Sequence, residues 1–260
     1  MPKVFLSHCS KDKQIVLRVR DYLRKSFLDA WLDEEAMSGG ERIIEDVLPA
    51  IQQSRYFVLF ISNHYLNSTW CNQELSEAMN LNRTRKNVII PVLLENESNL
   101  QFDAKEAING MLIRSIIQQV KYIKYDIYNP EPYIESIANA CWKNEPVKFD
   151  PIQTKNIGGA TVQIINFQLQ QQVLPDDFLK NWDINILKFR LPEKNMTPII
   201  QENIPVAFLG RAPNWLYAYL SIPFKNLNDV FLYNNVSESY ICVYSKNDKI
   251  LGKALKSSTS

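Results

Sequence analysis

Short apolar runs alternate with amphipathic stretches along the first half of the chain. The runs are rich in aromatic and β-branched residues and predict buried strands. They lie at Lys3–Ser7, Leu28–Leu32, Tyr56–Ile61, Val88–Leu94 and Val120–Tyr125. Apolar residues at helical spacing predict helices over about 15–27, 43–51, 70–81 and 132–142, whereas residues 95–120 show no clear period. Strands that alternate with helices in this way indicate an α/β fold, a parallel sheet with helices on both faces.

The stretch from Ser62 to Leu75 reads SNHYLNSTWCNQEL and follows the apolar run Tyr56–Ile61. It predicts a passage from strand to loop to helix. Such passages place side chains at the carboxyl edge of a parallel sheet, where α/β folds bind ligands. Trp70 and Glu74 are four residues apart, so an indole and a carboxylate share one face of the predicted helix. Taken alone, a glutamate in the first turn of a helix is usually a partner of the helix dipole.

Composition and charge narrow the function classes. The chain has 260 residues, enough for one large or two small domains, and its net charge of +1 argues against bulk electrostatic binding to nucleic acid. The four cysteines are scattered without a CxxC pair, so we expect a reduced, cytoplasmic protein without a zinc site. We predict no signal peptide or membrane span, and there is no GxGxxG motif or Walker loop. Both histidines, His8 and His64, lie in the first quarter, which excludes histidine-based catalysis in the second half.

Four motifs in the first half resemble the TIR domain, in the same order and spacing. They are Val4–His8, Trp31–Asp33 before the loop Ser38–Gly40, Phe57–Ser62 and Trp70–Leu75. The Ser-His pair and the Trp-Cys-x-x-Glu pattern are most similar to bacterial members. The resemblance covers residues 1–143 and implies a flavodoxin-like fold for this domain.

This resemblance implies an NAD glycohydrolase, an enzyme that cleaves the nicotinamide–ribose bond of NAD, with Glu74 as the catalytic residue. A carboxylate against the ribose would stabilise the positive charge of an oxocarbenium-like transition state. The residues expected to bind NAD are Ser7, His8, Trp31, Asp33 and Trp70. The loop formed by Met37, Ser38, Gly39 and Gly40 resembles the mobile segment that packs against a neighbouring TIR domain.

Several of these residues also have a purely structural interpretation, which stays open at this point. Trp31 and Trp70 are large apolar residues that commonly belong to a core. His8 is more simply explained by a hydrogen bond to a loop backbone group than by acid–base catalysis. No histidine or asparagine arrangement marks Cys71 as a nucleophile, so we interpret it as a small packing residue.

The second half begins with a segment typical of a linker and continues as a smaller module. Residues 144–160 contain two prolines and a Gly-Gly pair, which predict a linker. We therefore expect one domain at 1–143 and a second, α/β domain at 161–260. Within the second domain we predict a short helix at 175–182 and strands at 161–169, 184–189, 204–209, 230–233 and 240–244.

The run from Gly210 to Leu220, GRAPNWLYAYL, ends a predicted strand and opens a predicted helix. Pro213 suits the first helical position, and the free N–H groups there would form an anion site beside Arg211. The alternative is that Arg211 pairs with a local acid and that the aromatic residues of the run are core.

This run, with the strands that end at Val243-Tyr244-Ser245, is similar to the CRISPR-associated ring nucleases, CARF-like proteins that bind cyclic tetra-adenylate and cleave it with manganese. The resemblance covers about 160–255 and implies a ligand site at Gly210, Arg211, Ala212, Pro213 and Asn214. The catalytic pattern of that family is missing, because the region has no histidine. Asn234 and Asn235 stand where an acidic residue is expected, and Ser245 stands where a histidine is expected. We therefore predict that the domain binds the ring without cleaving it, and we expect no metal.

The two resemblances together imply a sensor fused to an effector. The prediction is an NAD glycohydrolase that is activated by cyclic oligoadenylate and depletes NAD in type III CRISPR antiviral defence. NAD is the substrate and cyclic tetra-adenylate the activator, so neither is a cofactor. We expect a homodimer, because a symmetric ring suits an isologous site, and a higher oligomer or filament, with no DNA or membrane partner. The alternatives are a non-catalytic TIR scaffold or adaptor and a ring nuclease that degrades cyclic tetra-adenylate.

Overall fold

The computed structural model describes residues 3–32, 42–85, 88–102, 107–143, 145, 147–170, 200–201, 203–224 and 229–256. The chain divides into two compact units, which are described separately below. The N-terminal unit comprises Pro2–Arg24 and Leu28–Lys143, and the C-terminal unit consists mainly of Asn144–Ser260, together with Lys25–Phe27. Within the described residues, every helix is too short or too polar to cross a membrane.

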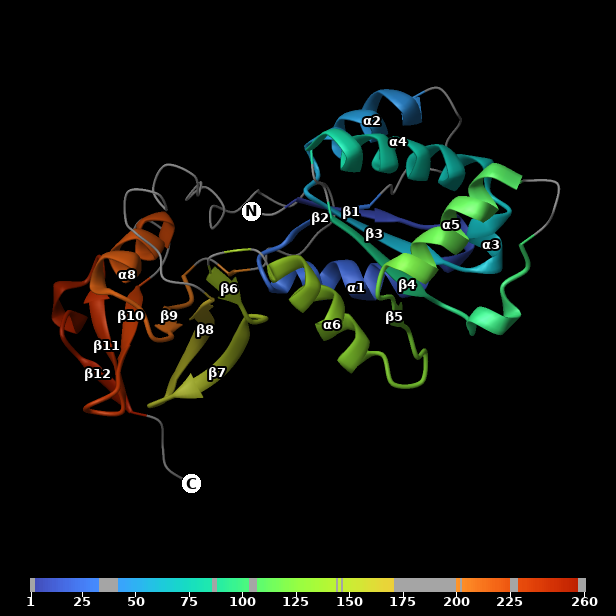
Figure 1. The fold of residues 1–260 in the computed structure, drawn as a ribbon. Helices are drawn as coiled ribbons and strands as arrows, with labels where there is room; N and C mark the ends of the chain where they lie inside the picture. The colour runs from blue at the N-terminus through green and yellow to red at the C-terminus, as the bar shows by residue number, and fades with distance from the viewer. Residues whose placement is uncertain are drawn as a thin grey trace. The chain divides into compact units, whose positions relative to one another are not determined.

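The N-terminal unit is built on a five-stranded parallel sheet in the order β2-β1-β3-β4-β5. The strands are β1 (Lys3–Ser7), β2 (Asp29–Trp31), β3 (Tyr56–Ile61), β4 (Val88–Leu93) and β5 (Ile123–Lys124). The helices are α1 (Lys13–Lys25), α2 (Arg42–Gln53), α3 (Asn63–Leu66), α4 (Thr69–Arg85), α5 (Ala107–Gln119) and α6 (Glu131–Trp142). Figure 1 shows α2 and α4 on one face of the sheet and α1 on the other. This is the flavodoxin-like strand order, so the predicted fold class of the first half is confirmed.

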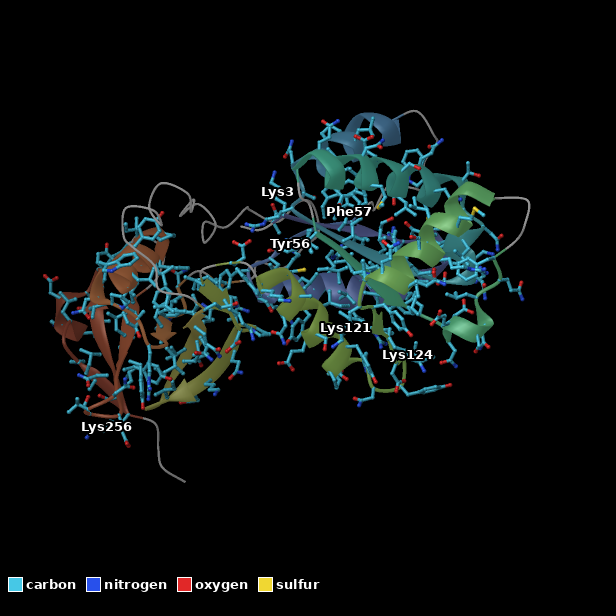
Figure 2. The ribbon with its side chains drawn as sticks, viewed as in Figure 1. Lys3, Tyr56, Phe57, Lys121, Lys124 and Lys256 are labelled. Carbon is cyan, nitrogen blue, oxygen red and sulfur yellow. The ribbon has the colours of Figure 1, made fainter. Side chains whose placement is uncertain are left out.

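The core of this unit fixes β3 at its centre and α4 against the sheet. All six residues of β3 are buried, because helices cover both faces of the parallel sheet and leave no polar side. Phe57, labelled in Figure 2, stacks on Phe5 of the neighbouring β1, with ring centroids 4.8 Å apart. The buried residues Cys71, Leu75 and Ala78 of α4 belong to the same core cluster. The packing of α4 on this core therefore holds the residues of its first turns near the carboxyl edge of the sheet.

Two parts of the N-terminal unit differ from expectation. The region 95–120, which showed no period, contains a short 3₁₀ helix, Glu97–Asn99, and the helix α5. The predicted strand at 120–125 is reduced to β5, which pairs with β4 through two residues only. Apolar residues occur on several sides of α5, so no amphipathic period marks it in the sequence.

The C-terminal unit contains a mixed sheet in the order β12-β11-β10-β9-β8-β6, with β7 paired to β8. The strands are β6 (Val147–Phe149), β7 (Gln153–Ile157), β8 (Ala160–Leu169), β9 (Val206–Leu209), β10 (Val230–Asn234), β11 (Ser239–Tyr244) and β12 (Ala254–Lys256). The strands β8, β9 and β10 are parallel, and the other pairings are antiparallel. The helix α8 (Asn214–Ser221) follows β9, and 3₁₀ turns lie at Ile222–Phe224 and Asp248–Ile250.

The segment predicted as a linker, 144–160, is instead part of this sheet. It carries β6 and β7, and both pair with β8. The Gly-Gly pair that suggested flexibility is a tight hairpin turn between β7 and β8. Gly158 has φ 58° and Gly159 has φ 83°, the positive values that a two-residue hairpin of this type requires. The helix predicted at 175–182 and the strand predicted at 184–189 lie outside the described residues.

Candidate active site

The carboxyl ends of β1 and β3 form the topological switch point of the N-terminal sheet. The chain leaves β1 to build β2 on one side, whereas β3 lies on the other side of β1. The connections that follow β1 and β3 therefore diverge, and in open α/β sheets ligands bind in the crevice at such a point. Ser7 is the last residue of β1, and Ser62 directly follows β3.

Glu74 lies at this edge and is bound to Ser7. The Oγ atom of Ser7 donates a hydrogen bond to Oε2 of Glu74 at 2.5 Å, and Ser7 is fully buried. Glu74 is only 5% exposed. It is the sixth residue of α4, beyond the first turn in which a carboxylate gains most from the helix dipole. Burying a carboxyl group is unfavourable unless it is hydrogen-bonded, and Ser7 supplies such a bond. The helix dipole does not account for a carboxyl group at this position.

Tyr65 of α3 is the third member of this buried cluster. Its hydroxyl oxygen lies 2.9 Å from Ser7 Oγ, and it also reaches the backbone oxygen of Cys71 at 3.3 Å. The side chain is fully buried. Burial raises the pKa of the Tyr65 phenol well above its usual value, and the nearby Cys71 and Glu74 raise it further. The phenol therefore keeps its proton at physiological pH.

A second set of hydrogen bonds fixes α3, and with it Tyr65. Ser62 caps α3, because its Oγ accepts a hydrogen bond from the backbone N–H of Tyr65. The same oxygen donates to Oδ2 of Asp12 at 2.6 Å. Asn63, the first residue of α3, donates from its backbone and its side chain to the carboxylate of Glu95. The short helix is thus tied to the loops after β1 and β4.

His8 and Cys71 serve local structure in this arrangement. The Nδ1 atom of His8 lies 3.1 Å from the backbone oxygen of Leu6, so the ring contacts a backbone group, although one of β1 and not of a loop. The Cys71 thiol donates to the backbone oxygen of His8 at 3.4 Å. Burial raises the pKa of Cys71 to about 12, so the sulfur is a thiol and not a nucleophilic thiolate. None of the four cysteines, all of which lie within the described residues, is in a disulfide.

The two tryptophans expected to bind NAD both contact the core. Trp31 stacks on Phe5, with ring centroids 5.0 Å apart and planes 17° apart. Trp31 and Trp70 are half-buried and pack against the core cluster of the N-terminal unit. Each indole therefore has a structural role, and its predicted contact with NAD stays a prediction. Asp33 and the predicted assembly loop, Met37, Ser38, Gly39 and Gly40, lie outside the described residues.

The predicted ligand site of the C-terminal unit is differently built. Gly210 follows β9, and a Cβ atom added there would lie 2.5 Å from the backbone oxygen of Phe167, so close packing requires a glycine. The Tyr217 hydroxyl donates to the Gly210 backbone oxygen. Pro213 is the extended N-cap residue of α8, one position before the predicted place. Arg211, Pro213 and Asn214 are exposed, and Ala212 is half-buried.

Two of the three residues that stand where ring-nuclease catalysts are expected, Asn234 and Ser245, hold turns of the C-terminal unit. Asn234 and Asn235 are exposed, and the Asn234 side chain accepts hydrogen bonds from the backbone N–H groups of Val236 and Ser237. Ser245 is buried and accepts from the backbone N–H of Asn247. These contacts are typical of turn residues.

Sequence reasoning missed Tyr65 as a member of the active-site cluster. Its only signal is a large aromatic residue inside the polar stretch that follows β3. The Ser62–Asp12 contact was equally invisible, because the partners are 50 residues apart in the sequence.

Comparison with known proteins finds a match to the N-terminal unit. A family model described as TIR domain matches residues 4–125. The matched residues carry the four motifs that predicted this similarity, and the match ends before Asn144, where the main part of the C-terminal unit begins.

Three relatives illustrate the range of similar proteins. The chain is 28% identical over 90 residues to the NAD(+) hydrolase TcpA of Theionarchaea archaeon (strain DG-70-1). This match covers 34% of this chain and 27% of that protein. It is 23% identical over 90 residues to the 2' cyclic ADP-D-ribose synthase AbTIR of Acinetobacter baumannii (strain 1295743), covering 34% of each. It is 30% identical over 129 residues to Toll-like receptor 4 of Pinctada imbricata, covering 46% of this chain and 13% of the receptor. The matches thus span about a third or less of these relatives.

Proposed function

We propose that this chain is an NAD glycohydrolase whose catalytic residue is Glu74. The observation that carries the proposal is the buried hydrogen bond between Glu74 and Ser7 at the β1/β3 switch point. A core contact gives no reason for a carboxyl group at this place, and a helix dipole gives little. Relatives that are named NAD(+) hydrolases support the same activity.

The chemistry requires one negative charge beside the ribose. The bond between C1′ of the ribose and the nicotinamide nitrogen breaks, and its electron pair goes to the nitrogen, which neutralises the pyridinium. The sugar becomes oxocarbenium-like, and water adds to C1′ and loses a proton. An ionised Glu74 stabilises the developing cation, and its fixed hydrogen bond to Ser7 keeps the carboxylate in place without reorganisation. Trp70, four residues earlier on α4, would line the ribose or nicotinamide side.

The C-terminal unit would act as the sensor. We propose that it binds cyclic tetra-adenylate at Gly210–Asn214 without cleaving it. The site lies at the carboxyl end of β9, between two parallel neighbours, and the exposed Arg211 is available to a phosphate. Ligand binding would favour a dimer and a higher oligomer in which Met37–Gly40 packs on the next TIR domain, provided that the ligand binds the assembled state more tightly. The outcome would be NAD depletion in type III CRISPR defence.

A non-catalytic scaffold is the second candidate. The similarity to a protein that is named as a receptor and not as a hydrolase is the observation on this side. A scaffold needs no charge at Glu74, so the two functions predict opposite effects of Glu74→Gln.

The test is NAD consumption by the purified chain with and without cyclic tetra-adenylate. We expect nicotinamide release that requires the ligand and that Glu74→Gln abolishes. The matched control is Glu77→Gln, which removes a carboxylate from the half-buried position three residues along the same helix. Equal NAD loss without ligand would remove the sensor role and keep the enzyme. No NAD loss with the ligand would favour the scaffold, and loss of the ring itself would indicate a ring nuclease.

A further inference from the structure

We propose that Tyr65 is a positioning residue that acts through Ser7, because its hydroxyl holds the Ser7 proton on Glu74. The inference rests on the proposed function and extends it to a residue that does not contact the reacting atoms. Tyr65, Ser7 and Glu74 come from three elements, α3, β1 and α4, and all are at least nine-tenths buried.

The number of protons in the cluster fixes the direction of its hydrogen bonds. A serine hydroxyl has one proton to donate and lone pairs that accept. Ser7 donates its proton to Glu74 at 2.5 Å. It has none left for Tyr65, so the 2.9 Å contact exists only if Tyr65 donates to Ser7. With an ionised glutamate, the order of donation is therefore Tyr65 to Ser7 to Glu74.

Tyr65 has a second possible hydrogen-bond acceptor, and the choice between the two acceptors bears on the charge of Glu74. The Tyr65 hydroxyl can also donate to the backbone oxygen of Cys71, at the longer distance of 3.3 Å. If it did so, the Tyr65–Ser7 contact would remain a hydrogen bond only if Ser7 donated to Tyr65, and Glu74 would then have to be protonated to keep its bond to Ser7. The shorter contact favours the order that suits the ionised carboxylate. Tyr65 thus supports the charge state that the reaction needs.

The surroundings of Tyr65 preserve this role. A phenol that stays protonated is a constant donor, and burial together with Cys71 and Glu74 raises the pKa of Tyr65. The Ser62 cap and the Ser62–Asp12 contact hold α3 in register with Ser7. Hydrogen bonds in a chain strengthen one another inside a protein, so removal of the Tyr65 hydroxyl weakens the next bond, between Ser7 and Glu74.

The test is a double-mutant cycle with Tyr65→Phe, Ser7→Ala and the double variant, with kcat and KM measured for NAD. We expect Tyr65→Phe to lower kcat about tenfold, the equivalent of one hydrogen bond, with KM unchanged. In the Ser7→Ala background the same change should have less than a twofold further effect, because its route to Glu74 is gone. The matched control is Tyr56→Phe, since Tyr56 is a second fully buried tyrosine of the N-terminal unit, at the opposite end of β3.

Two outcomes would overturn the proposal. One is an unchanged kcat in Tyr65→Phe. The other is an equal loss of kcat in both backgrounds together with a lower melting temperature than Tyr56→Phe, which would show that the hydroxyl only stabilises the fold.

A readout without NAD separates this inference from the proposed function. The Ser7 hydroxyl proton should give a downfield resonance in proton NMR that is absent in Ser7→Ala and moves upfield in Tyr65→Phe. An unmoved resonance would contradict the hydrogen-bond order. A moved resonance in a protein that never hydrolyses NAD would keep the hydrogen-bond order and refute both the catalytic role of Tyr65 and the proposed enzyme.

Discussion

The two units each place polar residues at the carboxyl end of a parallel strand, but they do so in different ways. In the N-terminal unit the polar groups are buried and hydrogen-bonded to one another from β1, α3 and α4. In the C-terminal unit, the polar residues after β9 are exposed, and the nearby glycine is explained by packing against Phe167. Burial of polar groups is unfavourable unless something compensates for it, whereas an exposed arginine costs the fold nothing. The first arrangement therefore carries more information about chemistry than the second.

A large effect, second only to the loss of charge in Glu74→Gln, should come from moving the Glu74 carboxylate without removing its charge. Glu74→Asp shortens the side chain by one methylene and withdraws it from Ser7, whose hydroxyl is 2.5 Å away. We expect a loss of about a hundredfold in kcat, because misplacement by about 1 Å has that effect on a positioned catalytic group. Steady-state NAD hydrolysis measures it. Wild-type activity in Glu74→Asp would mean that the exact position of the carboxylate does not matter. The buried N-terminal site would then carry no more information about chemistry than the exposed C-terminal site.

A smaller effect is expected from Gly210→Ala in the C-terminal unit. The added Cβ would lie 2.5 Å from the Phe167 backbone oxygen, so the strand or the loop must shift. Overpacking of this kind lowers the free energy of unfolding by about 1–3 kcal/mol. Denaturant unfolding provides the measurement. The control is Gly110→Ala in α5, where the nearest atom is at 3.8 Å and alanine should stabilise the helix slightly. Unchanged stability in Gly210→Ala would remove the packing explanation and leave a ligand as the reason for glycine.

Arg211→Ala tests whether the exposed site has a function at all. Loss of a charged hydrogen bond to phosphate should raise the cyclic tetra-adenylate concentration needed for half-maximal activation about tenfold. Its exposed position predicts an unchanged melting temperature. Lys249→Ala, another exposed cation of the C-terminal unit, is the matched control. If both variants respond to the ligand like the wild type, Arg211 has no part in binding.

The smallest effect concerns the support of the N-terminal cluster. Ser62→Ala removes the cap of α3 and the contact with Asp12. We expect a loss of about 1 kcal/mol in the free energy of unfolding and a modest loss of kcat through Tyr65. Ser76→Ala is the control, because this exposed serine only donates to a helix backbone oxygen. Equal stability of the two variants would show that α3 needs no cap.

The sequence predicted the N-terminal fold well where the hydrophobic pattern of a segment is typical of only one kind of element. The short, continuous apolar run of β3 predicted a buried strand, and the structure confirms it. The helix predicted over 70–81 begins one residue earlier, at Thr69, and ends four residues later, at Arg85. The helix α5 was missed because its own apolar residues are spread over several sides of the helix, so they show no amphipathic period. The strands β6 and β7 were mistaken for a linker, since a Gly-Gly pair fits a hairpin turn as well as a flexible joint.

The candidate site was predictable only in part. A motif resemblance brought Ser7 and Glu74 together, and the structure places them in contact. Tyr65 could not be predicted, because its role depends on a partner 58 residues away in the sequence. The predicted NAD contacts of His8, Trp31 and Trp70 compete with backbone or core contacts that become visible only in three dimensions.

The most direct test of the account is nicotinamide release from NAD, followed by NMR, in wild-type protein and Glu74→Gln under identical ligand conditions. The substitution keeps the size of the side chain and an oxygen that can accept from Ser7, so the fold should persist while the charge is lost. The account predicts release by the wild type and a rate lower by roughly a thousandfold in the variant, the effect of removing one electrostatic stabiliser. Release at the same rate by both proteins would contradict it.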